Sequence, residues 1–165
     1  MSTRQLWPNR PRDIRNLFNP AFCGLVLSRG IEGYNEKSEH SMPFSLSLLI
    51  LPLSLHRNTR EIIKKSNRSY FTNIVQDNPE ICINLAERII GLFPYMMEAY
   101  DFLMKCNCLY VDDHGLVYIN PNTIKKKISG SQDTIDCQTV ASSIGKKMAL
   151  INDRITIYTM LRIKP

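Results

Sequence analysis

The run of residues from Leu46 to Leu55 is the feature that most constrains how this chain can fold. Almost every position in it is apolar, and only Ser47, Pro52 and Ser54 interrupt it. A surface helix carries one apolar stripe and one polar face, so a run without a polar face predicts an element buried on most sides. The run is too short for a bilayer, which takes about 20 residues. We therefore expect it to form the centre of the core.

Residues around this run predict where its helix begins and breaks. Ser41 is a suitable N-cap, and Pro43 suits the first helical turn. Pro52 donates no N–H and its ring clashes with the preceding turn, so we expect it to kink or stop the helix.

A cationic segment follows the apolar run directly. His56, Arg57 and Arg60 lead it, and Lys64 and Lys65 lie one turn later. The planar guanidinium group of arginine suits carboxylates and phosphates at interfaces. We therefore take His56, Arg57 and Arg60 as candidates for binding a partner. The alternative is a solvated helix start, or a histidine bonded to backbone carbonyls.

Length and charge limit the class of protein. The 165 residues suffice for one domain with a real core, or for two small lobes that share one. The formal net charge of +6 permits an acidic partner or nucleic acid. It is nevertheless small for a dedicated DNA binder, in which basic residues cluster on one face.

The cysteines and the N-terminal residues indicate the cellular compartment of the protein. The chain has five cysteines, an odd number, and most lie within apolar helical patterns. This usage indicates reduced thiols. The N-terminal residues lack the apolar segment of a secretory signal. We therefore expect a cytoplasmic protein with no membrane partner.

The first 18 residues form a basic N-terminal arm in our interpretation. Its four arginines are Arg4, Arg10, Arg12 and Arg15, with Pro8 and Pro11 among them. We expect this arm to be extended, with Trp7 and Phe18 as its anchors. The alternative is a loosely tethered terminus. Residues 19–165 would then form a single domain.

A long helix is predicted to open that domain. Asn19 is its expected cap and Pro20 lies in its first turn. Apolar residues then recur at helical spacing as far as about Asn35. Three glycines weaken this helix but let another backbone approach closely, and these are Gly24, Gly30 and Gly33.

Several shorter patterns follow the apolar run. We expect short helices at residues 60–65 and 70–76, a helix at 79–93, and a further helix that Pro94 opens and that ends near Cys106. In the helix at 79–93 a second set of apolar residues broadens the first and predicts cover on two sides. This set is Ile83, Ala86, Ile90 and Phe93.

A β-hairpin is predicted after these helices. Residues 108–111 and 116–119 are β-branched and aromatic, and residues 112–115 favour a turn. Two helices that lead into a hairpin have the order of the second half of a winged-helix module. We therefore predict a mainly α, compact helical domain over residues 19–165, with a winged-helix-like C-terminal half and one β-hairpin at about 108–119.

The C-terminal part is predicted to be helical. Residues 122–136 indicate a basic, exposed connection, and a helix follows from Cys137 or Val140 to Ile151. Residues 154–163 alternate like a strand, yet some of them also form a helical patch. Asp153 is a suitable cap, which favours a short helix.

A winged helix suggests DNA binding, but the helix that would read DNA is not basic. It carries Met96, Met97, Glu98, Asp101 and Lys105, and its carboxylates would be repelled by phosphates. Methionine adapts to irregular partner surfaces. Met96 and Met97 are therefore candidates for binding a protein partner.

Basic residues elsewhere are the candidates for a sequence-independent contact with nucleic acid. A solvated loop and a solvated helix face are the alternative for them. The candidates are Lys125, Lys126, Lys127, Lys146, Lys147 and Arg154.

No catalytic constellation stands out. Cys106 and Cys108 lack the spacing of a structural zinc site, and His114 falls in the predicted turn. Asp112 and Asp113 are typical of that turn rather than of a catalytic pair. A phosphate-binding glycine loop is also missing. We therefore expect no enzyme activity, no metal and no cofactor.

Short motifs in a fixed order give the chain a family resemblance. They are Asn19-Pro20-Ala21-Phe22-Cys23, Leu51-Pro52-Leu53-x-Leu55-His56, Thr59-Arg60, Asn78-Pro79-Glu80, Ala86-Glu87-Arg88, Pro94-Tyr95-x-x-x-Ala99 and Ile157-Tyr158. From about Asn19 to its end, the chain resembles the middle component of three-component ABC systems. The small subunit of Lamassu-type bacterial defence complexes belongs to the same group.

The resemblance implies a non-enzymatic accessory or scaffold subunit. In such systems an SMC- or Rad50-like coiled-coil ABC ATPase senses nucleic acid, and an effector, often a nuclease, does the damage. The middle component lies between them. We therefore expect this chain to bridge the two, within an anti-phage or anti-plasmid defence complex that also makes non-specific DNA contact. The alternatives are a stand-alone winged-helix DNA-binding protein and an enzyme with an unrecognised site.

Overall fold

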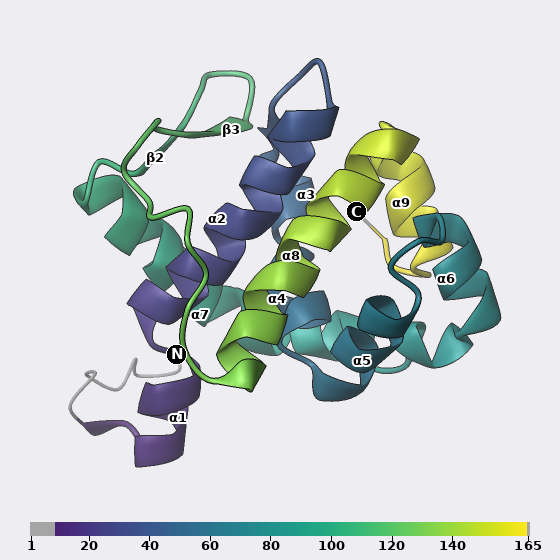
Figure 1. Cartoon of the computed structure of the whole chain (residues 1–165), viewed down its shortest axis with the longest axis horizontal. Coiled ribbons are helices and arrows are strands. Elements are labelled where there is room, and N and C mark those ends of the chain that lie inside the picture. Colours follow the sequence, from purple (N-terminus) through teal and green to yellow (C-terminus); the bar gives the residue numbers. More distant parts are fainter. Residues whose placement is uncertain (1–8, 165) are drawn as a thin grey trace.

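Helices make up most of the protein (Figure 1). The computed structural model describes residues 9–164. The helices are α1 (Arg12–Leu17), α2 (Pro20–Lys37), α3 (Phe44–Ser47), α4 (Ile50–Ser54), α5 (Arg57–Lys65), α6 (Phe71–Asp77), the 3-10 helix η2 (Pro79–Cys82), α7 (Leu85–Lys105), α8 (Gln132–Ile151) and α9 (Arg154–Met160). The strands are β1 (Met42–Pro43), β2 (Leu109–Val111) and β3 (Leu116–Ile119). None of the helices in the described part is long and apolar enough to cross a bilayer.

Helices α2 and α8 form the central contact of the molecule (Figure 1). Glycines let the two backbones meet there. A Cβ atom at Gly145 would lie 1.9 Å from the carbonyl oxygen of Gly30, and one at Gly33 would lie 2.3 Å from that of Ser142. The predicted close approach of another backbone is thus confirmed at Gly33, whereas a Cβ atom at Gly30 would meet the side chain of Ile50. Gly24 instead faces a leucine side chain.

The apolar run at residues 46–55 is buried, as predicted, and it lies under α2, α7 and α8. It forms two short helices, α3 and α4, rather than one. The break falls at Leu48, because Pro52 has no N–H to donate to the Leu48 carbonyl. The predicted start is wrong: Ser41 precedes strand β1, and α3 begins at Phe44.

The hairpin β2–β3 is confirmed, and a third strand joins it. The antiparallel order is β1-β3-β2, with Met42 opposite Val117 and Leu109 opposite Ile119. Asn35, near the end of α2, fixes this edge: its side-chain oxygen accepts from Met42 N at 2.8 Å, and its amide donates to Val117 O at 3.2 Å. A two-residue strand is too short to show alternation, so the sequence did not indicate β1.

Helix α7 runs without interruption through Pro94, so the prediction of two helices meeting there is wrong. Pro94 is exposed, and the carbonyl it leaves without an N–H partner belongs to Ile90, which is exposed too. Water can therefore take the place of the missing hydrogen bond. Asn78 and Pro79 begin only the short helix η2, and the main helix starts at Leu85.

Several helix ends differ from the prediction by a few residues. Helix α8 begins at Gln132, because Ser131 caps it by accepting from Thr134 N at 3.3 Å. The connection before it is therefore shorter than expected. The favoured helix at the C-terminus is confirmed: α9 is capped by Asp153, which accepts from Thr156 N at 3.0 Å.

The N-terminal arm is not extended throughout, because residues 12–17 form α1. Its attachment to α7 is well defined. Arg10 donates to the Glu98 carboxylate at 2.8 and 2.5 Å, and the Phe18 ring stacks on Tyr95 at 4.6 Å. Phe18 is thus confirmed as an anchor, whereas Trp7 lies outside the described residues. The division into an arm of 18 residues and a domain at 19–165 stays a prediction.

Candidate partner-binding site

The cationic segment after α4 is divided between the surface and the interior. Arg57 is exposed at the start of α5. His56 is the N-cap of that helix: its Nδ1 accepts from Thr59 N at 3.4 Å and lies 2.9 Å from Thr59 Oγ1. Histidine caps a helix here because its ring nitrogen provides the acceptor that Ser or Asp usually supplies.

Arg60 is buried and joins α5 to the end of α4 and the start of α8. Its side chain is only 3% exposed. It donates to the carbonyls of Ser54 and Leu55 at 3.1 and 3.0 Å, and it pairs with Asp133 at the start of α8. These bonds satisfy the C-terminal carbonyls of α4. The prediction that Arg60 faces a partner directly is therefore corrected, since its guanidinium group already holds three elements together.

The surroundings of His56 disfavour protonation of its ring. Partial burial lowers the pKa of His56 below its ordinary value, and the nearby cations Arg88 and Arg60 lower it further. A neutral ring can accept the Thr59 N–H, whereas a protonated ring cannot.

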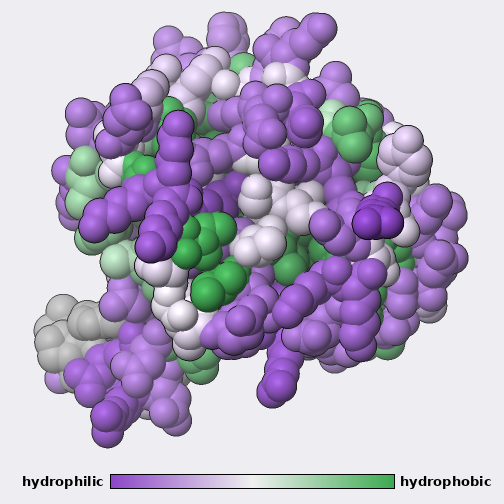
Figure 2. Space-filling view, in the orientation of Figure 1, coloured by the Kyte–Doolittle hydropathy of each residue, from purple (hydrophilic) through white to green (hydrophobic). Residues whose placement is uncertain are grey.

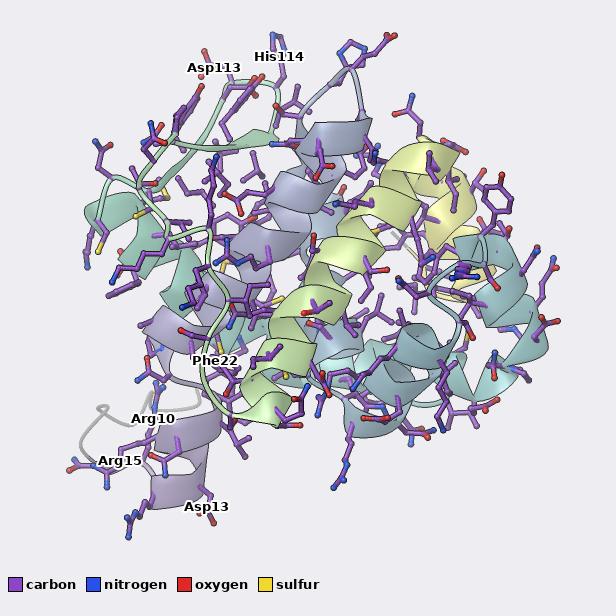
Figure 3. The ribbon with its side chains drawn as sticks, viewed as in Figure 1. Arg10, Asp13, Arg15, Phe22, Asp113 and His114 are labelled. Atoms are coloured by element: carbon purple, nitrogen blue, oxygen red, sulfur yellow. The ribbon has the colours of Figure 1, made fainter. Side chains whose placement is uncertain are left out.

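A pocket opens next to this segment, between α1 and the body of the protein. Its volume is about 430 Å³. We name it the α1 pocket. Figure 3 shows Phe22, one of its wall residues, at the start of α2 between α1 and the first turn of α8. Its apolar wall includes Leu17, Phe18, Phe22, Pro52, Leu92 and Tyr95.

One side of the α1 pocket is polar. His56, Arg60, Arg88 and Asp133 line it. Arg88 donates to Thr59 Oγ1 at 3.2 Å and to Ile81 O at 2.8 Å. Burial lowers the pKa of Arg88, because a charged guanidinium group is less stable away from water. The Nε atoms of Arg60 and Arg88 are both buried, and neither has a hydrogen-bond partner among the described residues.

The sequence analysis did not single out two of the four polar residues that line the α1 pocket, Arg88 and Asp133. Arg88 had a signal, because Arg88, Gly91 and Tyr95 follow one another at i, i+3 and i+7 and so share one side of α7. Asp133 had none, since it lies where an exposed connection was predicted.

The side of α7 that was predicted to be covered is exposed. Ile90 and Phe93 are 73% and 44% exposed, and Met104 near the end of the helix is 52% exposed. Ile83, which precedes the helix, is 63% exposed. We call Ile90, Phe93 and Met104 the α7 outer face. The prediction of cover on two sides is therefore wrong: α2 and α4 pack on the inner side of α7 only.

The two candidate methionines lie on different sides of α7. Met96 is fully buried in the core, so it is corrected from a surface position to an internal one. Met97 is half-buried, and it follows Phe93 by one turn at the edge of the α7 outer face. By contrast, the face in Figure 2, which α8 crosses, is mostly hydrophilic.

The candidate nucleic-acid residues do not form one group. Lys125, Lys126 and Lys127 are exposed in the connection before α8, which Arg29 fixes to α2 by donating to the carbonyl of Lys125. Lys146 pairs with Glu36 at 3.0 Å.

Lys147 is an internal residue and Arg154 an exposed one. Lys147 Nζ donates to the carbonyls of Asn67 and Ser69 at 2.8 and 2.5 Å. Burial lowers the pKa of its ammonium group. Lys147 therefore ties α8 to the loop before α6 and is corrected as a surface candidate.

The hairpin turn has the role predicted for it. Asp112 accepts from His114 N and Leu116 N, both at 2.9 Å, and these bonds lower the pKa of its carboxyl group. Figure 3 shows Asp113 and His114 at the tip, at the opposite end of the view from α1. Within residues 9–164, no three His, Cys, Asp or Glu side chains are grouped to hold a metal ion.

Comparison with known proteins gives one clear result. Residues 7–165 match the family model described as ABC-three component (ABC-3C) system Middle Component 3. No curated protein and no solved structure matches the chain. The match spans both the α1 pocket and the α7 outer face.

Proposed function

The chain belongs to the Middle Component 3 family of ABC three-component systems, and from this premise we propose that it is a non-enzymatic scaffold that bridges two other components. As a middle component it serves a bacterial defence system and associates with the other components of that system. In our proposal these are an SMC- or Rad50-like ABC ATPase and an effector such as a nuclease, arranged as in a Lamassu-type complex in the cytoplasm.

The observation that carries this proposal is the α7 outer face. Ile90, the most exposed large apolar residue described, lies on it together with Phe93. Neighbouring exposed apolar side chains on one helix are typical of a protein-binding surface. Removing them from water on docking contributes about 25 cal/mol per Å² of apolar area.

The proposal is tested by co-expressing the tagged chain with the proteins encoded beside it and weighing the purified complex by mass photometry. We expect a coiled-coil ATPase to elute with it in a fixed ratio. Ile90→Glu should fold normally and reduce the amount of bound partner at least tenfold. Ile155→Glu is the matched control, because Ile155 is 66% exposed and lies on α9, outside the α7 outer face.

Two results would contradict the proposal. If the chain elutes alone, it is not a bridging subunit. If Ile90→Glu and Ile155→Glu retain equal amounts of partner, the α7 outer face is not the docking surface.

One observation favours the alternative of a winged-helix DNA binder. The sheet order β1-β3-β2, with a helix leading into the hairpin, supports this alternative. Against it, the two successive helices on which the winged-helix prediction rested are the single helix α7. Under this alternative the exposed Lys125, Lys126 and Lys127 would contact phosphates. A steep salt dependence of duplex binding by the isolated chain would support it. The outward side of α7 argues for a protein partner instead, since it presents Ile90 and Phe93 rather than basic residues.

A further inference from the structure

The α1 pocket has the size and walls of a binding site for one large apolar side chain. Its volume of about 430 Å³ lies within the range of ligand pockets. Gly91 forms part of its floor, and a Cβ atom built there would have no neighbour within 4 Å. The space above Gly91 is thus open to an incoming group.

The charge on the polar side of the pocket is unbalanced. Arg60 and Arg88 contribute two positive charges, and Asp133 is the one carboxylate among the lining residues. Asp133 is already paired with Arg60. Arg88 has hydrogen bonds only to a hydroxyl group and a carbonyl, and it forms no ion pair with any residue in the range 9–164.

Two buried donors remain unused at this site. The Nε–H groups of Arg60 and Arg88 have no acceptor in the described part of the chain, although the Arg60 side chain is 97% buried, being 3% exposed. A buried donor without a partner costs free energy, and a carboxylate is a strong acceptor for guanidinium groups.

We propose that the α1 pocket binds a segment of another component of the same system, which places a large apolar side chain against Phe18, Phe22 and Tyr95 and a carboxylate beside Arg88. This inference rests on the proposed function, because it gives the chemistry of one of the two bridged components. A peptide segment fits because the lining includes the exposed residue Leu17, so a chain can reach the pocket from solvent.

The position of the pocket on α7 agrees with a bridging role. Arg88, Gly91 and Tyr95 line the pocket, whereas Ile90 and Phe93 belong to the α7 outer face. Ile90 follows Arg88 by two residues, which turns it through about 200° around the helix axis. One helix therefore presents two separate binding surfaces on nearly opposite sides.

The experiment uses the co-expressed complex with three variants of this chain. Gly91→Leu fills the pocket and should not harm folding, because leucine favours helices more than glycine. Arg88→Gln removes the unpaired charge. Gly91→Ala is the control, since one methyl group leaves most of the pocket free. We expect Gly91→Leu and Arg88→Gln to lower the bound fraction of one component at least tenfold, and Gly91→Ala to retain it.

A photo-crosslinker then identifies the bound segment. We would place benzoylphenylalanine at Leu17, which lines the pocket and is 58% exposed. The expected crosslink is to another component, at a large apolar residue next to Asp or Glu. A crosslinked segment without an acidic residue, a crosslink within this chain, or no crosslink would overturn the inference.

The outcomes separate this inference from the proposed function. If the unaltered chain recovers no component, the proposed function fails and the inference with it. If the complex forms and Gly91→Leu and Arg88→Gln bind as well as the control, the bridging proposal stands and the α1 pocket is not used. Thermal melting of each variant shows that the change in binding is not a loss of folding.

Discussion

The contact between α2 and α8 and the outer face of α7 show two opposite uses of a helix surface. At the first, glycines bring the two backbones so close that Gly145 leaves no space for a Cβ atom. At the second, Ile90 and Phe93 extend into solvent with nothing from the described chain packed over them. The contrast indicates that stability is concentrated in α2 and α8, whereas α7 keeps apolar area for association.

The largest effect is expected at the closed contact. In Gly145→Ala the new Cβ would meet the Gly30 carbonyl at 1.9 Å, and both backbones would have to shift. We expect the free energy of unfolding to fall by about 3 kcal/mol or more, the upper end of overpacking costs. Chemical denaturation measures this. A variant as stable as the parent would show that α2 and α8 are not in backbone contact.

An identical small deletion on each helix sharpens the comparison. Ile144 on α8 is fully buried, and Ile90 on α7 is 73% exposed. We expect Ile144→Val to cost about 0.5–1.5 kcal/mol in unfolding free energy. Ile90→Val should change it by less than about 0.5 kcal/mol. Equal losses in denaturant titrations would mean that the α7 outer face is covered in the free protein.

Replacing Gly91 on α7 by alanine should change stability in the opposite direction to replacing Gly145. Gly91 is exposed within the helix, and its Cβ would meet nothing. We expect Gly91→Ala to stabilise the protein by about 0.5–1 kcal/mol, because alanine loses less backbone entropy in a helix. The midpoint of thermal unfolding should rise. A fall in the midpoint would place a neighbouring group against this side of α7.

The smallest expected effect is the pH dependence of stability that arises from His56, which lies beside the α1 pocket. Its folded-state pKa is lowered by partial burial and then by Arg88 and Arg60. The unfolded chain therefore binds the proton more readily, and stability falls slightly as pH drops from about 6.5 through the folded-state pKa. NMR titration of the ring should give a midpoint below about 6.5.

The same titration in Arg88→Gln tests the placement of α7. Removing one of the two cations should move the His56 midpoint upward, because the protonated ring would meet less repulsion. An unchanged midpoint would indicate that Arg88 lies farther from His56 than the α1 pocket requires.

Much of the fold could be predicted, because local rules decide it. Asn19 and Asp153 cap their helices as residues of their type usually do, and the apolar run at 46–55 is buried. The continuity of α7 through Pro94 could not be predicted, since it depends on Pro94 lying on the solvent side. Periodicity shows that a helix has an apolar side, but not whether the same chain covers it.

The candidate site could be predicted only in part, for a similar reason. Arg57 and Arg60 are three residues apart and look alike in the sequence, yet one is exposed and the other is 3% exposed. What separates them is Asp133, which lies 73 residues further along the chain. Lys146 and Lys147 differ in the same way, because only Lys147 faces the carbonyls of Asn67 and Ser69. Such long-range partners leave no local pattern.

The α2–α8 contact also has a consequence for synthesis on the ribosome. Helix α2 ends at Lys37, whereas α8 begins at Gln132. Translation proceeds at roughly 5–20 residues per second, so α8 is synthesised on the order of 5–20 s after α2. During that interval the side of α2 that packs against α8, at Gly33, stays uncovered. The domain therefore completes its core only after α8 has been synthesised, and this delay is set by the distance in sequence between two helices that touch in space.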